Sequence, residues 1–233
     1  MADMGSLQRP KILVIVHQVT STPGRIGMML KDMGYSLDIR RPCLGDALPE
    51  TMDEHAGAVV FGGPMSANDP EPWIAREIDW IGVPLKEKKP FLGVCLGAQM
   101  LSMHLGGKVG PHDGGHVEIG YYPIQAVNGG DGIKDWPQMV YQWHRESFTL
   151  PQGAKLFARG EQFENQAFRY GPAYGIQFHP EVTRLTMHRW VVSGAHRFTL
   201  PGAQGAGEHL EGHLTHDAAV KLWLAQFLSR WLA

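Results

Sequence analysis

The residues best suited to chemistry lie in the stretch PFLGVCLGAQM, residues 90–100. An apolar run there leads into Cys95, with Gly93 and Gly97 two positions away on either side, and then into a helical pattern. This spacing is typical of a nucleophile elbow, a strand-to-helix turn so tight that larger flanking side chains would clash. The free N–H groups and positive dipole of the helix start favour a thiolate, the reactive form of cysteine. We therefore predict that Cys95 is a nucleophile rather than a small core residue or part of a structural turn.

A base for this thiol is offered by GIQFHPEV, residues 175–182, where an apolar strand-like run ends in His179 and Glu181. If the backbone stays extended through Pro180, the two side chains point to the same side. The carboxylate can then hold one ring nitrogen and leave the other for a thiol, which is the logic of a catalytic triad. A histidine and a glutamate in a surface turn would be the plain alternative.

Donors for an oxyanion are predicted in FGGPMSAND, residues 61–69, where a glycine pair follows a strand-like run. Acyl transfer passes through a tetrahedral intermediate whose negative oxygen needs N–H groups in fixed positions. The N–H of Gly63 and that of Leu96, the residue after the nucleophile, are the natural pair.

The elements that must position these residues alternate between strand and helix in the first half of the chain. Strands are predicted at 11–17, 36–40, 57–61 and 90–94, and helices at 24–34, 72–87 and 95–107. Short strand-like pieces at 117–125, 139–144, 154–159, 165–170 and 173–178 read as antiparallel additions, followed by helices at 182–196 and 215–232 with a glycine-rich loop, 201–209, between them. This order predicts an α/β fold: an open, mostly parallel sheet with helices on both faces and added antiparallel strands.

Composition excludes several classes of function. The chain has 233 residues, with 21 lysines and arginines against 23 acidic residues and a net charge of -2, so neither nucleic acid nor a membrane is an expected partner. Two cysteines make no disulfide framework, and neither a secretory signal nor an apolar run of membrane-helix length is recognisable. We expect a cytoplasmic protein that folds as one domain over residues 1–233 and acts on a small molecule.

With these residues in view, the chain resembles the class I glutamine amidotransferases, the triad-type glutaminases typified by the amidotransferase part of GMP synthase. The resemblance covers roughly residues 11–200 and leaves a helical extension of about 201–233. Its matching segments are VVFGGPMSANDP (59–70), FLGVCLGAQML (91–101), VEIGYYPI (117–124), QWHRESFTLP (142–151) and NQAFRYGPAYGIQFHPEV (165–182).

The resemblance implies a flavodoxin-like sheet and hydrolysis of the side-chain amide of L-glutamine through a glutamyl thioester on Cys95, without cofactor or metal. His179 would activate the thiol and then the water, and Glu181 would orient the imidazole. Gln99 matches the family position that contacts glutamine, and Gly62 is a further expected substrate contact. The segment that holds the amino-acid end of glutamine corresponds here to Trp143, His144 and Arg145.

Two departures from the family pattern bear on the substrate. Ala98 stands where many members have histidine, and Arg145 stands where the family has glycine. The chain has no room for a synthetase and contains no P-loop, so we expect ammonia to pass to a separate synthetase partner. The alternatives are a γ-glutamyl hydrolase acting on a modified substrate and a non-catalytic regulatory relative; intact Cys95, His179 and Glu181 argue against the latter.

Other residues that invite a functional interpretation have plainer ones. In HDGGH, His112 and His116 are separated by glycines that prevent aligned metal ligands, so no metal site is expected. Cys43 lacks an elbow and a base and is expected to be inert. The apolar face of the last helix is expected to dock on the sheet rather than on a partner. The remaining histidines of the terminal helices are expected to be solvated: His188, His196, His209, His213 and His216.

Overall fold

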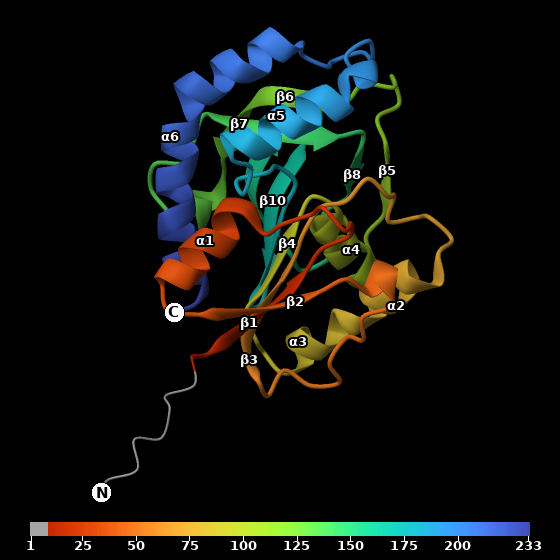
Figure 1. Cartoon of the computed structure of the whole chain (residues 1–233), viewed down its shortest axis with the longest axis vertical. Helices are drawn as coiled ribbons and strands as arrows, with labels where there is room; N and C mark the ends of the chain where they lie inside the picture. The colour runs from red at the N-terminus through yellow and green to blue at the C-terminus, as the bar shows by residue number, and fades with distance from the viewer. Residues whose placement is uncertain (1–8) are drawn as a thin grey trace, which may run out of the picture.

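The structure is a computed structural model that describes residues 9–233, the side chains of residues 130 and 131 excepted. Its centre is a nine-stranded sheet in the order β2-β1-β3-β4-β11-β10-β9-β6-β7, with helices on both faces (Figure 1). The strands are β1 Lys11–Ile15, β2 Ser36–Arg40, β3 His55–Val60, β4 Phe91–Val94, β6 Glu118–Ala126, β7 Met139–His144, β9 Lys155–Gly160, β10 Asn165–Tyr170 and β11 Ala173–Ile176. The α-helices are α1 Gly24–Asp32, α2 Pro72–Trp80, α3 Gly82–Lys86, α4 Leu96–His104, α5 Arg184–Ser193 and α6 Ala206–Trp231.

The first five strands of this order are parallel, which confirms the predicted α/β fold class. They are apolar and buried on both faces because helices cover each side, as in the run KILVI of β1. The chain order reverses between β1 and β3, the point at which sheets of this kind bind ligands beyond the carboxyl ends of their strands.

β11 is a correction to the predicted topology. The sequence pattern groups it with the antiparallel additions, but it pairs parallel with β4, with Tyr174 opposite Leu92. Strands β10, β9, β6 and β7 are antiparallel additions as predicted. A second, two-stranded sheet that the sequence pattern does not indicate joins β5, Val109–Pro111, to β8, Glu146–Phe148.

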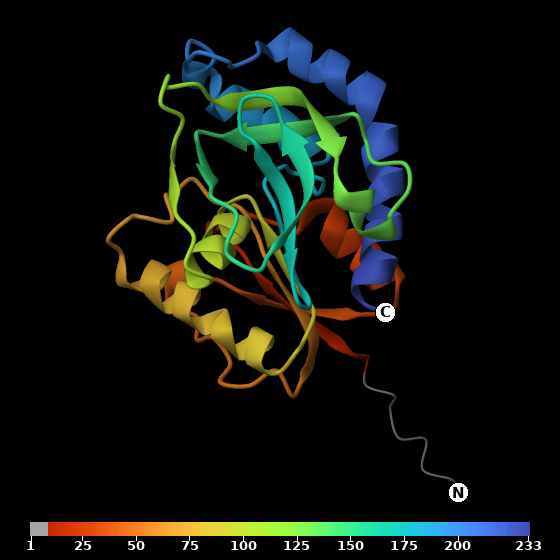
Figure 2. The ribbon, with the colours of Figure 1, turned by 180° about the vertical axis from the view of Figure 1, so that it is seen from behind.

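The apolar core has a layer on each face of the sheet. On one face α1 and α6 contribute Ile26, Leu30, Trp223 and Phe227, all at most 2% exposed. On the other face α2, α3 and α4 pack, and the two views from opposite sides show this division (Figures 1 and 2). The apolar face of α6 therefore docks on the sheet, as predicted.

Two helix boundaries differ from those predicted. The helix predicted over 72–87 is divided into α2 and α3 at Ile81, because Pro84 has no N–H to donate to the carbonyl of Trp80. The last helix starts at Ala206 rather than 215, so the end of the glycine-rich segment, residues 206–209, is helical. Across residues 9–233, none of these helices combines the length and apolar character needed to cross a membrane.

Candidate active site

Cys95 stands alone between β4 and α4, in a strained backbone conformation. Its φ is +51°, a value that side-chain-bearing residues rarely adopt. Gly93 and Gly97 permit the turn: a Cβ on Gly93 would collide with the carbonyl of Gly97, and one on Gly97 with the carbonyl of Val60. The N–H of Cys95 donates to the carbonyl of Ile176 at 2.8 Å, which fixes the turn to β11. The geometry is that of a nucleophile elbow.

His179 and Glu181 form a buried pair just beyond β11. The Nδ1–H of His179 donates to Oε1 of Glu181 at 2.7 Å, and the two residues are 4% and 6% exposed. The backbone N–H of His179 donates to the carbonyl of Tyr141 on β7 at 2.8 Å, and the ring of Trp190 on α5 lies edge-to-face over the imidazole with centroids 4.9 Å apart. These contacts hold the ring in one orientation.

The other ring nitrogen of His179 takes no part in the contact with Glu181. Within the described residues its Nε2 is buried without a hydrogen-bond partner. Burial alone would lower the pKa of His179, but the carboxylate of Glu181 and the thiol of Cys95 outweigh it and raise the pKa to about 10. The pocket thus favours a protonated imidazole, the form that stabilises a neighbouring thiolate.

Helix α1 contacts the backbone of the His179–Glu181 pair. The N–H of Arg25 donates to the carbonyl of Glu181 at 2.8 Å, and its guanidinium donates to both carboxylate oxygens of Asp217 on α6 at 2.7 Å. Gly24, with φ +50°, lies so close to the Glu181 carbonyl that a Cβ there would collide with it. Helices α1 and α6 therefore fix the backbone of the pair.

The first residue of the glycine pair, Gly62, lies beside both the thiol and the imidazole. A Cβ on Gly62 would stand 3.0 Å from Cε1 of His179 and 3.8 Å from Sγ of Cys95, so only glycine leaves this space open. Gly63 and Leu96 line the same cavity as Cys95. The N–H of Leu96 opens helix α4, where the first-turn donors have no acceptor within the helix.

Gln99 and His144, both expected at the substrate, hold the wall of the cavity. Gln99 donates through Nε2 to the carbonyl of Glu146 at 2.8 Å, and His144 donates through Nδ1 to the same oxygen at 3.0 Å. The other nitrogen of His144 contacts Oε2 of the buried Glu118 at 2.9 Å. Both side chains line the cavity while fixing the backbone after Arg145.

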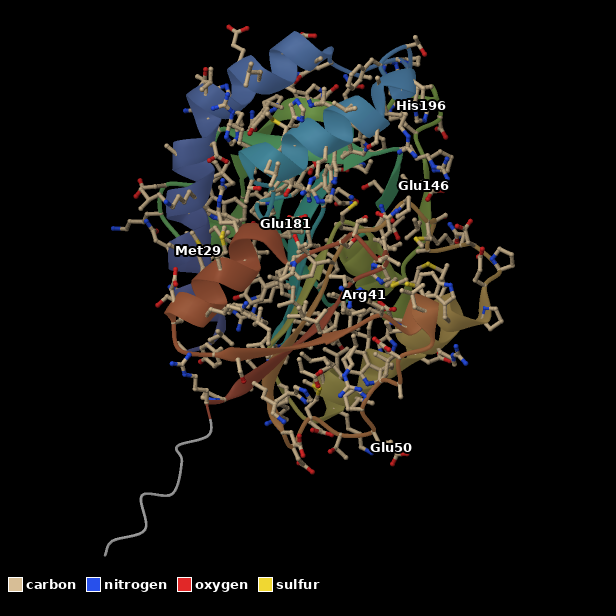
Figure 3. All side chains as sticks on the ribbon, viewed as in Figure 1. Met29, Arg41, Glu50, Glu146, Glu181 and His196 are labelled. Atoms are coloured by element: carbon tan, nitrogen blue, oxygen red, sulfur yellow. The ribbon has the colours of Figure 1, made fainter. Side chains whose placement is uncertain are left out.

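The cavity at the site has a volume of about 730 Å³, and Trp143 and Arg145 belong to its wall. Arg145, Arg189 and Arg197 also line it, and none forms an ion pair with a carboxylate in the described part of the chain. Figure 3 shows Glu181 below α5, with Glu146 and His196 near the other end of that helix. The cavity that contains the thiol is thus also lined by three cationic side chains.

Two histidines have surroundings that the sequence did not indicate. His17, beyond β1, contacts the glycine-pair backbone and the buried Glu77; the available signal was a polar residue at the carboxyl end of a buried strand. His209, expected to be solvated, is 0% exposed and contacts the hydroxyl of Tyr141 at 2.9 Å, because α6 begins early enough to carry it onto β7.

The remaining candidates stand apart from the site. Cys43 lies in a short 3-10 turn after β2, and burial raises the pKa of its thiol. His112 and His116 face each other with ring centroids 5.3 Å apart, and no group of three metal-ligating side chains occurs among residues 9–233.

Comparison with known proteins places the chain among glutamine amidotransferases. The model of the family "Glutamine amidotransferase class-I" matches residues 26–193. The glutamine amidotransferase-like protein YfeJ of Salmonella typhimurium is 30% identical over 184 residues, 74% of this chain and 76% of its own. The glutamine-hydrolysing GMP synthase subunit of Methanocaldococcus jannaschii is 30% identical over 176 residues, covering 73% of this chain and 88% of its own.

Solved structures agree with this result. A glutamine amidotransferase from Thermotoga maritima is 30% identical and superposes with a TM-score of 0.86 over 96% of this chain and 98% of its own. A glutamine amidotransferase from Methylobacillus flagellatus is 26% identical, with a TM-score of 0.87 over 96% of this chain and 94% of its own.

Proposed function

The chain belongs to the class I glutamine amidotransferase family, and from this premise we propose that it hydrolyses the side-chain amide of L-glutamine to glutamate and ammonia with Cys95, His179 and Glu181 as its catalytic triad. The observation that carries the proposal is the strained elbow at Cys95, which shares one cavity with the buried His179–Glu181 pair.

In the acylation step the sulfur of Cys95 attacks the amide carbon while its proton resides on Nε2 of His179. The carbonyl oxygen gains negative charge and is stabilised by the N–H groups of Leu96 and Gly63. The imidazolium then gives its proton to the amide nitrogen, the C–N bond breaks, and ammonia leaves a glutamyl thioester on Cys95.

In the deacylation step His179 takes a proton from water, which attacks the thioester carbon. A second tetrahedral intermediate collapses with loss of the sulfur as leaving group, and glutamate is released. Glu181 stabilises the imidazolium in both steps through its 2.7 Å contact with Nδ1.

The test is release of glutamate and ammonia from L-glutamine by the purified chain. Cys95→Ser should abolish it, and Cys43→Ser is the matched control, because Cys43 lies outside the cavity. A glutamine-like chloroketone should label Cys95 alone. Labelling that survives Cys95→Ser would contradict the assignment, and a wild-type chain that takes up no label would favour a regulatory role.

The ammonia is proposed to reach a separate synthetase chain. Relatives that are named as single subunits of GMP synthase support this, and the chain spans 35% of the length of the GMP synthase of Aeropyrum pernix, to which it is 30% identical. Addition of the partner should stimulate ammonia release, whereas a high rate without any partner would favour a solitary hydrolase.

A second candidate function is hydrolysis of a γ-glutamyl conjugate, favoured by the three arginines of the cavity wall that have no carboxylate partner among the described residues. Arg145→Gly distinguishes the two candidates. If Arg145 restricts entry of free glutamine, the variant should raise kcat/KM for glutamine, and an unchanged or lower value would remove that role from Arg145.

A further inference from the structure

His17 and Glu77 form a buried pair directly behind the glycine pair. His17 is 1% exposed and Glu77 0% exposed, and Nε2 of His17 lies 2.9 Å from Oε1 of Glu77. The opposite ring nitrogen, Nδ1, lies 3.1 Å from the carbonyl oxygen of Gly62. Trp73 stacks on the imidazole with centroids 5.5 Å apart, which restrains the ring.

The contact with Gly62 fixes the direction of the neighbouring N–H. The carbonyl of Gly62 and the N–H of Gly63 belong to one planar trans peptide unit, so they point in opposite directions. A carbonyl held toward His17 therefore turns the N–H of Gly63 away from it. Position 63 must be glycine, because a Cβ would stand 2.9 Å from Cβ of His17.

The contact with the Gly62 carbonyl requires a proton on Nδ1 of His17. The Gly62 carbonyl can only accept a hydrogen bond, and the same is true of an ionised Glu77 carboxylate. A ring protonated at Nδ1 and Nε2 therefore satisfies both contacts. Burial opposes this form, but Glu77 outweighs it and raises the pKa of His17. The result is a charge-assisted hydrogen bond to the Gly62 carbonyl, stronger than one between neutral groups.

We propose that His17, held by Glu77, is a positioning residue that aims the N–H of Gly63 at the developing oxyanion. The inference rests on the proposed function and goes beyond it, since His17 does not line the cavity that holds the thiol. Polarisation of the peptide unit by the His17 donor also strengthens the N–H of Gly63 as a donor, because hydrogen bonds in a chain reinforce one another.

Two substitutions of His17 separate positioning from stability. The amide of His17→Asn reaches the place of Nδ1 and keeps a donor for the Gly62 carbonyl, but it leaves Glu77 buried without its partner. The longer amide of His17→Gln reaches the place of Nε2, keeps the contact with Glu77 and loses the donor to Gly62.

The proposal predicts that the less active of the two variants is the more stable one. His17→Gln should lower kcat by about 10- to 100-fold with KM nearly unchanged, as expected for a donor used only in the transition state. His17→Asn should keep most of the wild-type kcat while having the lower melting temperature of the two, because it strands a buried charge. If kcat instead follows melting temperature, so that His17→Gln is the more active variant, the proposal is overturned.

His55→Gln is the matched control. His55 is another buried histidine paired with a carboxylate, with Nε2 3.1 Å from Asp38, but it begins β3 at the edge opposite the cavity. Its substitution should lower stability and leave kcat unchanged. A loss of kcat equal to that of His17→Gln would assign the effect to general destabilisation and overturn the proposal.

An NMR measurement without substrate tests this inference separately from the proposed function. In ¹H–¹⁵N spectra the Gly63 amide signal of His17→Gln should move away from that of His17→Asn, since both variants lack the ring and differ in the donor to Gly62. Coincident Gly63 signals would refute the positioning role. A wild-type chain that releases no glutamate would refute the proposed function, and the Gly63 signals would still decide the role of His17.

Discussion

At the residue scale, the site depends on a histidine that is buried and yet favoured in its charged form. The pKa of His179 is raised to about 10 because Glu181 and Cys95 outweigh the cost of burial. A charge in such a place persists only while its partner remains, so substitution of the partner tests the arrangement directly.

Glu181→Gln should lower kcat by roughly 10²- to 10⁴-fold, because the amide cannot stabilise an imidazolium and can favour the wrong tautomer of His179. KM for glutamine should change little. The measurement is steady-state glutamate release, with Glu161→Gln as a control that lies outside the cavity. Equal kcat values for Glu181→Gln and the wild type would remove Glu181 from the proposed triad.

The same pair predicts a pH dependence of stability. A histidine in the unfolded chain has a pKa of about 6.5, and the folded pKa of His179 is about 10. Because the folded value is the higher one, the stabilisation is complete below about pH 6.5 and is lost as pH rises through about 10. The free energy of unfolding, measured in urea between pH 7 and pH 10, should fall more steeply for the wild type than for Glu181→Gln. Parallel curves would contradict this linkage.

What the sequence could predict at this scale depended on distance along the chain. Cys95 has its two glycines within two positions, and His179 has its carboxylate two positions away, so local patterns indicate both. The partner of His17, Glu77, lies 60 residues away in the sequence, and His144 contacts Glu118 on the neighbouring antiparallel strand. Such contacts depend on strand order and register, which no local pattern specifies.

At the element scale, α1 has a glycine at each end, and the two glycines have different surroundings. Gly24 begins the helix against the carbonyl of Glu181, whereas Gly34 follows its end with φ +95° and nothing within 4 Å of a Cβ. Gly24 is required because its φ is positive and because no Cβ fits beside Glu181. Gly34 is required only because its φ is positive.

Gly24→Ala should therefore lower both stability and kcat, because the added methyl must displace the backbone that carries Glu181. Gly34→Ala should cost about 1 kcal/mol of stability, the usual penalty for a residue with a side chain in this conformation, and leave kcat unchanged. Thermal unfolding and glutamate release measured on the same preparations check both expectations. Equal effects of the two substitutions on kcat would show that contact with Glu181 is unimportant.

The two helix boundaries that differ from the prediction have different causes, one local and one tertiary. The end of α2 follows from Pro84, although the periodic apolar pattern continues past it. The sequence pattern places the start of α6 nine residues late because glycines disfavour helices in isolation. Gly212 lies inside the helix and packs so closely on β6 that a Cβ would collide with the ring of Tyr121, so tertiary packing overrides its low helix propensity.

At the scale of the whole molecule, α6 joins the site to the core. It buries Trp223, Phe227 and Leu228 against the sheet and carries Asp217, the partner of Arg25. The parallel strands β1 to β4 are predictable from alternating strands and helices. The parallel placement of β11 is not, because six strands separate it from β4 along the chain, four of them in the same sheet.

Trp223→Ala should destabilise the fold by about 3–5 kcal/mol, since Trp223 is 0% exposed and its removal leaves a large cavity. Its neighbour Leu222 is 59% exposed, and Leu222→Ala should change stability by no more than about 0.5 kcal/mol. Chemical denaturation of the two variants provides the comparison. A small loss for Trp223→Ala would mean that α6 is not part of the cooperative core.

The distribution of charge over the molecule makes a last prediction about substrate choice. The chain carries a net charge of -2, yet its cavity wall holds three arginines without carboxylate partners in the part of the chain that the structure describes. If these arginines receive an anionic part of a γ-glutamyl conjugate, γ-glutamyl-glutamate should be hydrolysed with a kcat/KM about tenfold higher than that of the nearly isosteric γ-glutamyl-glutamine. The preference should shrink as salt rises, because Arg145 and Arg189 are exposed, Arg197 is half-buried, and dissolved ions screen such charges. Arg189→Ala should reduce it, whereas Arg184→Ala, on the same helix but outside the cavity, should not. Equal kcat/KM values for the two conjugates at low salt would leave the cationic wall without a role in substrate choice and favour free glutamine as the substrate.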